Sequence, residues 1–423
     1  MSQDVSDPVE FADIEAARER LDDPSVVKRT PVERSTSLES MTGASRVHLK
    51  LEQLQWTGSF KTRGAYNKIR TCLDGGPVDE VVAASAGNHA QGVALAATKL
   101  GVDSTIVMPQ NAPQTKVNAT RGYGATVELV GKDFQEAMAH AKELVAGPRT
   151  EFVHAYDDPA IVAGQGTLGI EMYEDLPEVD TVVVPIGGGG LISGISTALA
   201  ELGPDTRIVG VQAEGAATVA DSLAKGTPQT LEEVDTIADG IATGGISELT
   251  LSIIERNVDE VVTVTNSQIA DAVLLLMERA KQVVEGAGAA SVAAIRGDDL
   301  DVSGEVVMPL LCGGNLDMTM LRAVLVHALT QRKQILRLRV HIDDRPGKMA
   351  ELSGIIAEHD ANIQSVRHDR AVADLDVGDA YLTFQVESTG EGHARNIIES
   401  IADHGYEVEV LSSGRAESRP MGP

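Results

Sequence analysis

The sequence contains little cysteine, few aromatic residues and no long apolar run. Its two cysteines, Cys72 and Cys312, fit neither a disulfide framework nor a zinc motif. Aromatic residues make up 3% of the chain against 43% for all hydrophobic residues, so aliphatic side chains must form the core. No segment approaches the roughly 18 apolar residues of a membrane helix, and the acidic N-terminus lacks the apolar core of a signal peptide. We therefore expect a cytoplasmic protein.

Basic residues are also scarce. The chain has 35 Lys and Arg residues against 63 Asp and Glu residues, which gives a net charge of −28. A surface of this charge repels phosphate backbones and anionic lipids. We therefore expect no nucleic-acid partner and no membrane partner.

Segments typical of strands alternate with segments typical of helices along most of the chain. Short β-branched runs and longer helical patterns follow one another from about Glu33 to Ala328, which is typical of βαβ units with a largely parallel sheet. Helices are expected at Ala90–Leu100 and at Leu316–Gln331. Strands are expected at Arg46–Leu51, Val81–Ser85, Ser104–Met108, Thr126–Val130, Glu151–His154, Thr181–Ile186, Arg207–Gln212 and Val306–Leu311.

A second pattern begins after Gln331. Apolar and polar residues alternate from Leu336 to Ile342, which predicts a strand with one solvent-facing side. A turn at Asp344–Gly347 and a helical face from Met349 to Ile356 follow. Further strands near Asn362–Arg370, Ala380–Glu387 and Glu407–Leu411, with a helix at Ala394–His404, complete a βαββαβ module of the α+β class.

Glycine-rich segments follow several of the predicted strands. In open α/β sheets, ligands bind at the carboxyl ends of strands, where helix N-termini face them. Gly187, Gly188, Gly189 and Gly190 follow an apolar strand and open a helix, but the Gly-x-Gly-x-x-Gly spacing and the P-loop lysine are missing. This pattern favours a site for a single phosphomonoester, and its alternative is a flexible turn.

Lys61 stands between Gly58-Ser59-Phe60 and a helix-compatible run. A partly enclosed lysine has a lowered pKa and more free amine to attack a carbonyl group. The alternative is a solvated lysine at the start of a helix. Cys72 is expected in the loop after that helix, without a chemical role.

Ser85-Ala86-Gly87-Asn88-His89 lies between a predicted strand and a predicted helix. The backbone N–H groups of such a turn can hold a carboxylate, and the Asn88 amide can donate to an oxygen of a cofactor. His89 is expected as a helix-start residue rather than as a base.

These motifs together resemble one family. The segments Ser59-Phe60-Lys61-x-Arg63-Gly64-Ala65, Ser85 to Gly92, Gly187 to Gly190 and Cys312-Gly313-Gly314-Asn315 occur in the order of the threonine ammonia-lyases (threonine dehydratases), members of the tryptophan-synthase-β-like pyridoxal-phosphate enzymes. The C-terminal module, with Asp344-Arg345-Pro346-Gly347-Lys348, resembles an ACT domain.

The resemblance implies an α/β protein of pyridoxal-phosphate fold type II, with two open twisted subdomains and a C-terminal α+β ACT domain. The expected domains are a catalytic domain at 1–331, an ACT regulatory domain at 332–412 and a disordered tail at 413–423.

The resemblance also implies residue roles. Lys61 forms the Schiff base with pyridoxal 5'-phosphate, and Phe60 packs beside the ring. Asn88 bonds the phenolic oxygen, and Cys312 faces the pyridine nitrogen. The other implied cofactor contacts are Gly187, Gly188, Gly189, Gly190 and Leu191 at the phosphate, with Gly240 and Glu285 near the ring. The substrate carboxylate is implied to meet Ser85, Ala86, Gly87, Asn88 and His89.

The implied reaction is β-elimination of L-threonine to 2-oxobutanoate and ammonia, and of L-serine to pyruvate. Serine racemase is an alternative, but that family has a serine where this chain has Ala86. The metal site of the racemases is incomplete in this chain. Glu214 matches one of its ligands, but Ala220, six residues later, stands where that family has an aspartate. A non-catalytic amino-acid sensor is a further alternative. Isoleucine or valine is the implied effector, in a homo-oligomer that is a dimer or a tetramer.

Overall fold

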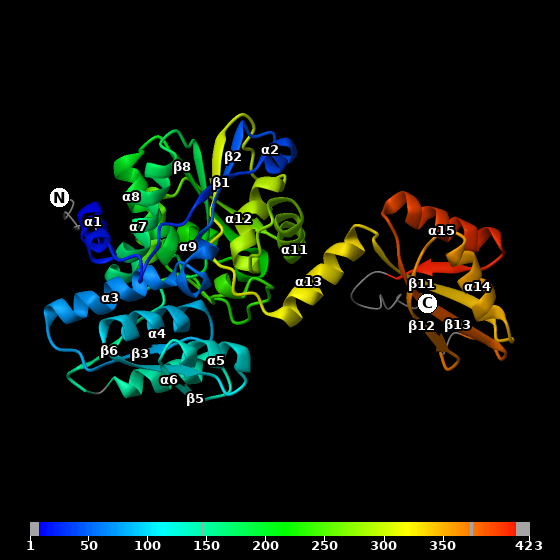
Figure 1. Ribbon diagram of the computed structural model, residues 1–423, viewed down its shortest axis with the longest axis horizontal. Helices are drawn as coiled ribbons and strands as arrows, with labels where there is room; N and C mark the ends of the chain where they lie inside the picture. The colour runs from blue at the N-terminus through cyan, green and yellow to red at the C-terminus, as the bar shows by residue number, and fades with distance from the viewer. Residues whose placement is uncertain (1–7, 146, 373–374, 412–423) are drawn as a thin grey trace. The chain divides into compact units, whose positions relative to one another are not determined.

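The computed structural model describes residues 8–145, 147–372 and 375–411, and these form two compact units that divide between Asp317 and Met318 (Figure 1). The expected disordered tail at 413–423 lies outside the described residues. The helix α13 (Met318–Gln331) belongs to the second unit. The functional division into 1–331 and 332–412 stays a prediction.

The larger sheet of the first unit has six strands in the order β1-β2-β10-β7-β8-β9. β1 runs antiparallel to β2, and every other neighbouring pair is parallel. β7 is fully buried, as its Thr-Val-Val-Val-Pro sequence predicts. The strands are β1 (Val32–Arg34), β2 (Arg46–Lys50), β7 (Thr181–Pro185), β8 (Arg207–Ala213), β9 (Glu260–Val264) and β10 (Val306–Pro309).

The smaller sheet of the first unit has four parallel strands in the order β5-β4-β3-β6. Alternate residues of β3 face opposite sides: Val81 and Ala83 pack with α4 (Asn88–Leu100), and Val82 and Ala84 pack with α6 (Phe134–Leu144). Helices on both faces explain why β3 is apolar without interruption from Val81 to Ala84. The strands are β3 (Glu80–Ala84), β4 (Asp103–Met108), β5 (Thr126–Leu129) and β6 (Thr150–Phe152).

The two parallel sheets confirm the predicted pair of α/β subdomains, with their helices around them in Figure 1. Every expected strand is present with its ends shifted by a few residues, and β1 and β9 are additional. The remaining helices of the unit are α1 (Phe11–Arg20), α2 (Thr36–Thr42), α3 (Lys61–Gly75), α5 (Gln114–Gly122), α7 (Pro159–Asp175), α8 (Gly190–Leu202), α9 (Val219–Lys225), α10 (Glu248–Asn257), α11 (Asn266–Leu275) and α12 (Gly286–Arg296).

The loop position expected for Cys72 is wrong, because α3 continues to Gly75 and Cys72 lies inside it. The helix ends only where Gly75 and Gly76 remove the side chains that favour helical backbone. At its other end α3 begins at Lys61, directly after a tight turn in which Thr57 and Gly58 have φ values of 64° and 73°. The lysine therefore stands on the first turn of a rigid element.

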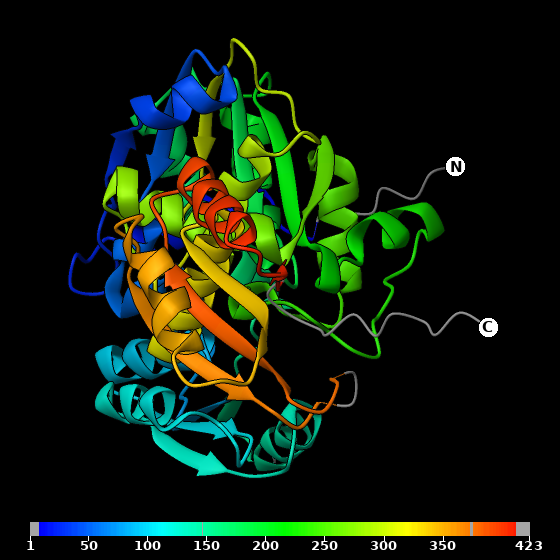
Figure 2. The same cartoon turned by 90° about the vertical axis from the view of Figure 1, so that its right-hand side faces the viewer.

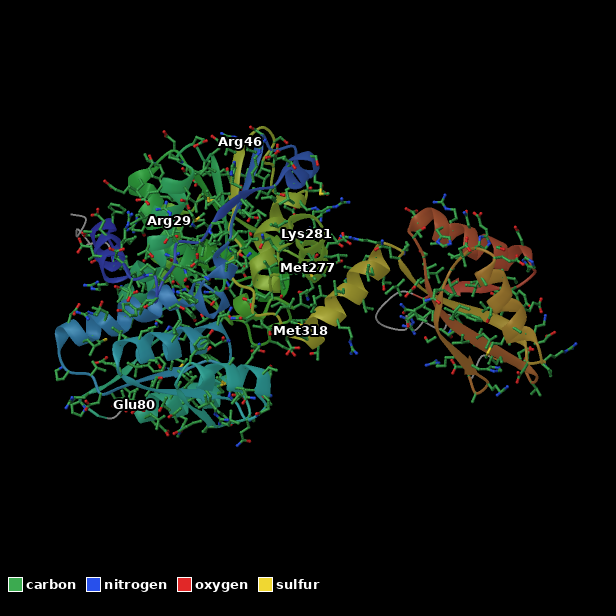
Figure 3. The ribbon with its side chains drawn as sticks, in the orientation of Figure 1. Arg29, Arg46, Glu80, Met277, Lys281 and Met318 are labelled. Carbon is green, nitrogen blue, oxygen red and sulfur yellow. The ribbon has the colours of Figure 1, made fainter. Side chains whose placement is uncertain are left out.

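A buried group of charges holds α3 in place. The Arg63 guanidinium, 1% exposed, donates to Glu52 at 2.6 Å and to Glu171 of α7 at 2.7 Å. Burial opposes the charge on Arg63, but these two carboxylates raise the pKa of the guanidinium above its usual value. Lys50 extends the group to Asp175, which Arg29 reaches from the surface (Figure 3).

The second unit is a βαββαβ module with an antiparallel sheet in the order β12-β13-β11-β14, as the alternating pattern predicts. Figure 2 shows α14 and α15 next to one another on this sheet, and both pack into one apolar cluster with its strands. The elements are β11 (Ile335–Asp343), α14 (Lys348–Ala357), β12 (Ile363–Asp369), β13 (Asp379–Glu387), α15 (Glu391–Asp403) and β14 (Val408–Val410).

No helix among the described residues combines the length and the apolar character needed to cross a membrane.

We predict that Arg63→Met destabilises the first unit by about 3–5 kcal/mol, because Glu52 and Glu171 lose the cation that compensates their burial. Urea unfolding followed by circular dichroism measures this loss. The matched control is Arg34→Met, which breaks the pair with Glu39 around a guanidinium that is 53% exposed and should cost far less, because solvent screens this pair. Equal losses in the two variants would contradict the prediction.

Candidate active site

One cavity of about 570 Å³ opens in the first unit, and its lining contains all the residues to which the sequence analysis gives a cofactor or substrate role. This volume lies within the range of small-molecule sites. The lining combines the carboxyl ends of strands from both sheets with the first turns of α3, α4 and α8. The predicted residues in the lining are Phe60, Lys61, Ser85, Ala86, Gly87, Asn88, His89, Gly187, Gly188, Gly189, Gly190, Leu191, Gly240, Glu285 and Cys312.

The amine of Lys61 lies inside this cavity. Its Nζ donates to the backbone oxygen of Ala155 at 3.1 Å and lies 5.0 Å from the centre of the Phe60 ring. Burial removes water from the ammonium group and lowers the pKa of Lys61 to about 8. A substantial fraction of the amine is therefore neutral near physiological pH, so the solvated-lysine alternative is wrong.

The four glycines form the turn between β7 and α8. Gly189 has a φ of 89°, and a Cβ at this position would lie 2.8 Å from Cβ of Thr250. A Cβ on Gly188 would collide with the ring of Tyr156. Only glycine fits here, and the backbone N–H groups at the start of α8 are left free of side chains, which makes a cradle for an anion.

Asn88 and Glu285 meet across the cavity. Nδ2 of Asn88 donates to Oε1 of Glu285 at 2.7 Å. Burial raises the pKa of Glu285 to about 7, against the lowering effect of the Asn88 hydrogen bond. A Cβ on Gly240 would lie 2.7 Å from this carboxylate, and a Cβ on Gly313 would also collide with it. The carboxylate therefore occupies a slot between two glycines.

Cys312 follows β10 and is 3% exposed. Burial raises the pKa of its thiol, and the negative charge of Glu285 adds to the effect. The group is a neutral thiol that can meet a ring nitrogen without placing a charge beside it.

The turn from Ser85 to His89 opens α4. Oγ of Ser85 accepts from the backbone N–H of Gly87 at 3.1 Å, which stabilises the turn. Nε2 of His89 lies 2.9 Å from the backbone oxygen of Val153, and since a carbonyl only accepts, this nitrogen carries the hydrogen. Burial lowers the pKa of His89 to about 3. His89 is thus a neutral structural residue at the start of the helix.

Several lining residues were not predicted. Lys116 and Asp239 form an ion pair of 3.1 Å at the cavity, and the hydroxyl of Tyr156 donates to the backbone oxygen of Gly245 at 3.3 Å. Asn315 and Thr243 also line the cavity. Asn315 and Asp239 lie inside motifs that the sequence marks, whereas no sequence signal indicates Tyr156 or Thr243.

The lining fits pyridoxal phosphate. Its donor set is a neutral amine, an anion cradle, an amide donor and a neutral thiol, which match the aldehyde, the phosphate, the ring oxygen and the ring nitrogen of that cofactor. In addition, Oγ1 of Thr243 is buried without a hydrogen-bond partner in the described part of the chain. A buried polar atom without a partner indicates that a polar ligand belongs here.

No group of three His, Cys, Asp or Glu side chains within the described ranges could hold a metal ion, and Glu214 has no such companions there.

Comparison with known proteins agrees with this assignment. The family model described as pyridoxal-phosphate dependent enzyme matches residues 25–313. A Thermotoga maritima protein named L-threonine ammonia-lyase is 43% identical over 403 residues, which are 95% of this chain and 100% of that protein. A Geobacter sulfurreducens protein of the same name is 42% identical over 91% of this chain and 96% of its own length.

Two solved structures are similar to about three quarters of this chain. The processed form of threonine deaminase isoform 2 from Solanum lycopersicum has a TM-score of 0.70 and 35% identity, covering 74% of this chain and 92% of that chain. Maize serine racemase has a TM-score of 0.71 and 34% identity, covering 77% of this chain and 99% of that chain. With a matching family model over most of the chain and a cavity of the required chemistry, this protein belongs to the pyridoxal-phosphate dependent enzymes.

Proposed function

We propose that this enzyme deaminates L-threonine by β-elimination to 2-oxobutanoate and ammonia, and L-serine to pyruvate and ammonia. The observation that carries the proposal is the 43% identity to an L-threonine ammonia-lyase over 95% of this chain and the whole of that relative. The cavity supports it, since it holds the Lys61 amine and, at the start of α4, a separate place for a carboxylate.

In this proposal the cofactor is held by the residues of the cavity. Lys61 is its covalent anchor and Phe60 packs beside its ring, while Gly187 to Gly190 and Leu191 hold its phosphate. Asn88 donates to its ring oxygen, and Cys312 meets its ring nitrogen. Gly240 and Glu285 complete the wall. When bound, pyridoxal phosphate supplies the electron sink for the pair released at Cα of the substrate.

Lys61 moves the proton. Once the amine of threonine has taken its place, the free Lys61 amine, with its pKa near 8, takes the proton from Cα. The β-hydroxyl leaves with a proton as water, which balances the proton that Lys61 takes from Cα. The released enamine then takes up one water and gives 2-oxobutanoate and ammonia. His89 is a poor base, because burial lowers its pKa to about 3 and disfavours the protonated ring.

The start of α4 binds the substrate carboxylate. Ser85, Ala86, Gly87, Asn88 and His89 line the cavity at the N-terminus of a 13-residue helix. Free N–H groups and the helix dipole stabilise a negative charge at such an end. A carboxylate fixed here leaves Cα and the β-hydroxyl directed into the rest of the cavity.

Serine racemisation is the second candidate, and the similarity to maize serine racemase is what favours it. Racemisation needs an acid–base group on the face of Cα opposite Lys61. Ala86 stands in the cavity where the racemase family carries a serine, and it has no proton to exchange. Elimination is therefore the better-supported reaction.

We further propose that the second unit is an ACT domain that binds isoleucine or valine near Asp344–Lys348, as in a biosynthetic, allosterically controlled enzyme of isoleucine formation. The βαββαβ order of the unit supports this. The protein is proposed to be a homo-oligomer, a dimer or a tetramer. The free thiols of Cys72 and Cys312 suit a reducing compartment, which supports a cytoplasmic location.

Lys61→Ala is expected to lower kcat for threonine at least about 1,000-fold, because both the covalent anchor and the base are removed. Oxoacid release measures this, and circular dichroism checks the fold. In wild type, covalent capture of pyridoxal phosphate by the apoenzyme should accelerate as pH rises through about 8, where Lys61 loses its proton. The matched control is Lys132→Ala, at a side chain 79% exposed, which should retain full activity. Activity in Lys61→Ala would overturn the assignment.

Wild-type enzyme is expected to consume L-serine without forming D-serine, because Ala86 offers no second acid–base group. Chiral chromatography of the remaining substrate measures this directly. Ala86→Ser restores a hydroxyl at this position and should produce detectable D-serine alongside pyruvate. D-serine formation by wild type at a rate similar to pyruvate release would favour the racemase.

Isoleucine is expected to shift the threonine saturation curve, because an effector bound by the second unit has to change affinity or turnover at the cavity. Initial rates over a range of threonine concentrations, with and without millimolar isoleucine or valine, test this. Asp344→Ala removes a carboxylate of the proposed effector site and should abolish the shift, whereas Glu358→Ala, outside that site, should keep it. Identical saturation curves in wild type with and without either amino acid would show that the second unit does not bind isoleucine or valine as an effector.

A further inference from the structure

Asn315 lies where the loop after β10 meets the loop that carries Lys61. The backbone N–H of Gly314 donates to the oxygen of Gly58 at 2.9 Å, and Ser59 forms an isolated antiparallel bridge with Gly313. The two loops are therefore joined by backbone hydrogen bonds next to Asn315 and next to Thr57. These bonds restrain the backbone positions of both residues.

The orientation of the Asn315 amide follows from its partners. One side-chain atom lies 2.6 Å from the backbone oxygen of Thr57, and because a carbonyl can only accept, this atom is the nitrogen Nδ2. The other face of the amide is confined, since a Cβ on Gly58 would lie 2.5 Å from Oδ1 of Asn315. The backbone carbonyl of Thr57 thus determines which way the Asn315 amide points.

Asn315 passes this orientation on to Asn88. The same Nδ2 lies 2.7 Å from a side-chain atom of Asn88, which has to accept and is therefore Oδ1. The remaining atom of the Asn88 amide is its Nδ2, directed to Oε1 of Glu285 at 2.7 Å. This nitrogen carries two hydrogens, and Glu285 accepts one of them. The second hydrogen is available to a ligand in the cavity.

We propose that Asn315 is a positioning residue that fixes Asn88 as a hydrogen-bond donor toward the ring oxygen of bound pyridoxal phosphate. The inference rests on the role proposed for Asn88. An unrestrained asparagine can present either its oxygen or its nitrogen, and the oxygen would repel an acceptor such as that ring oxygen. Asn315 removes this choice, because its Nδ2 donates a hydrogen bond to Oδ1 of Asn88.

The test uses Asn315→Asp, which keeps the shape of the side chain and removes both donated hydrogen bonds. The introduced carboxylate can only accept, so Asn88 is expected to turn its nitrogen toward it and its oxygen toward the cofactor. We expect pyridoxal phosphate to bind about tenfold to a hundredfold more weakly, with a shifted absorption maximum of the bound cofactor in the absence of substrate. Fluorescence titration of the apoenzyme gives the Kd.

A double-mutant cycle separates action through Asn88 from action through Thr57. If Asn315 works through Asn88, then Asn315→Asp changes the Kd and the spectrum much less in an Asn88→Ala background than in wild type. An equal effect in both backgrounds would overturn the proposal, because the changes in Kd and spectrum would then come from the lost contact with Thr57.

The matched control is Asn67→Asp. Asn67 is 1% exposed, lies on α3 outside the cavity lining, and donates to the backbone oxygen of Ala160 at 2.7 Å. Oδ1 of Asn67 also accepts from Arg20 at 3.1 Å, so the introduced carboxylate has a cationic partner. The variant should leave the cofactor spectrum unchanged. A spectral change as large as that of Asn315→Asp would show a general effect of an added carboxylate and refute the proposal. Thermal unfolding of each apoprotein identifies variants that fail to fold. Absence of oxoacid release by wild type would refute the proposed function while leaving the spectral comparison intact.

Discussion

The buried contact of Arg63 with Glu52 and Glu171 is the interaction on which the rest of the catalytic unit depends. It fixes the first turn of α3, and Lys61 stands on that turn two residues earlier. A flexible lysine on a solvated helix would keep its charge and its freedom of movement. Here the charges that anchor the helix are satisfied among themselves, so the neighbouring amine can be enclosed without a counter-ion of its own.

That enclosure acts on three ionisable groups at once. Burial lowers the pKa of Lys61 and raises the pKa values of Glu285 and Cys312. Loss of water disfavours the charged form of each group, whatever its sign. The base is thus available as an amine, and the thiol remains neutral. A single physical cause, the exclusion of water by two subdomains that meet at their strand ends, prepares the cavity for a neutral and reactive lysine.

The order of strands and helices and the place of the cavity were predictable from the sequence, because both depend on local patterns. The strand and helix order follows from apolar periodicity, and the cavity follows from glycine-rich turns at strand ends. β1 escaped prediction because it has three residues, two of them exposed and charged. β9, with the sequence Glu-Val-Val-Thr-Val, was missed although its β-branched residues favour a strand. Contacts between distant residues could not be predicted either: Arg63 meets Glu171 over 108 positions, and Asn315 meets Asn88 over 227. Only the folded chain shows which polar groups become partners.

The slot that holds the Glu285 carboxylate ties two separate loops to the Asn88 amide. Gly240 and Gly313 come from different loops, and a Cβ at either position would collide with the same carboxylate oxygen. A side chain at either glycine would therefore push this oxygen away from Nδ2 of Asn88, which donates to it at 2.7 Å. A Cβ at Gly240 would in addition lie 2.8 Å from Cβ of Ala287, so moving Glu285 alone does not make room there. The orientation of one amide in the cavity thus depends on the absence of side chains in two loops that the sequence places far apart.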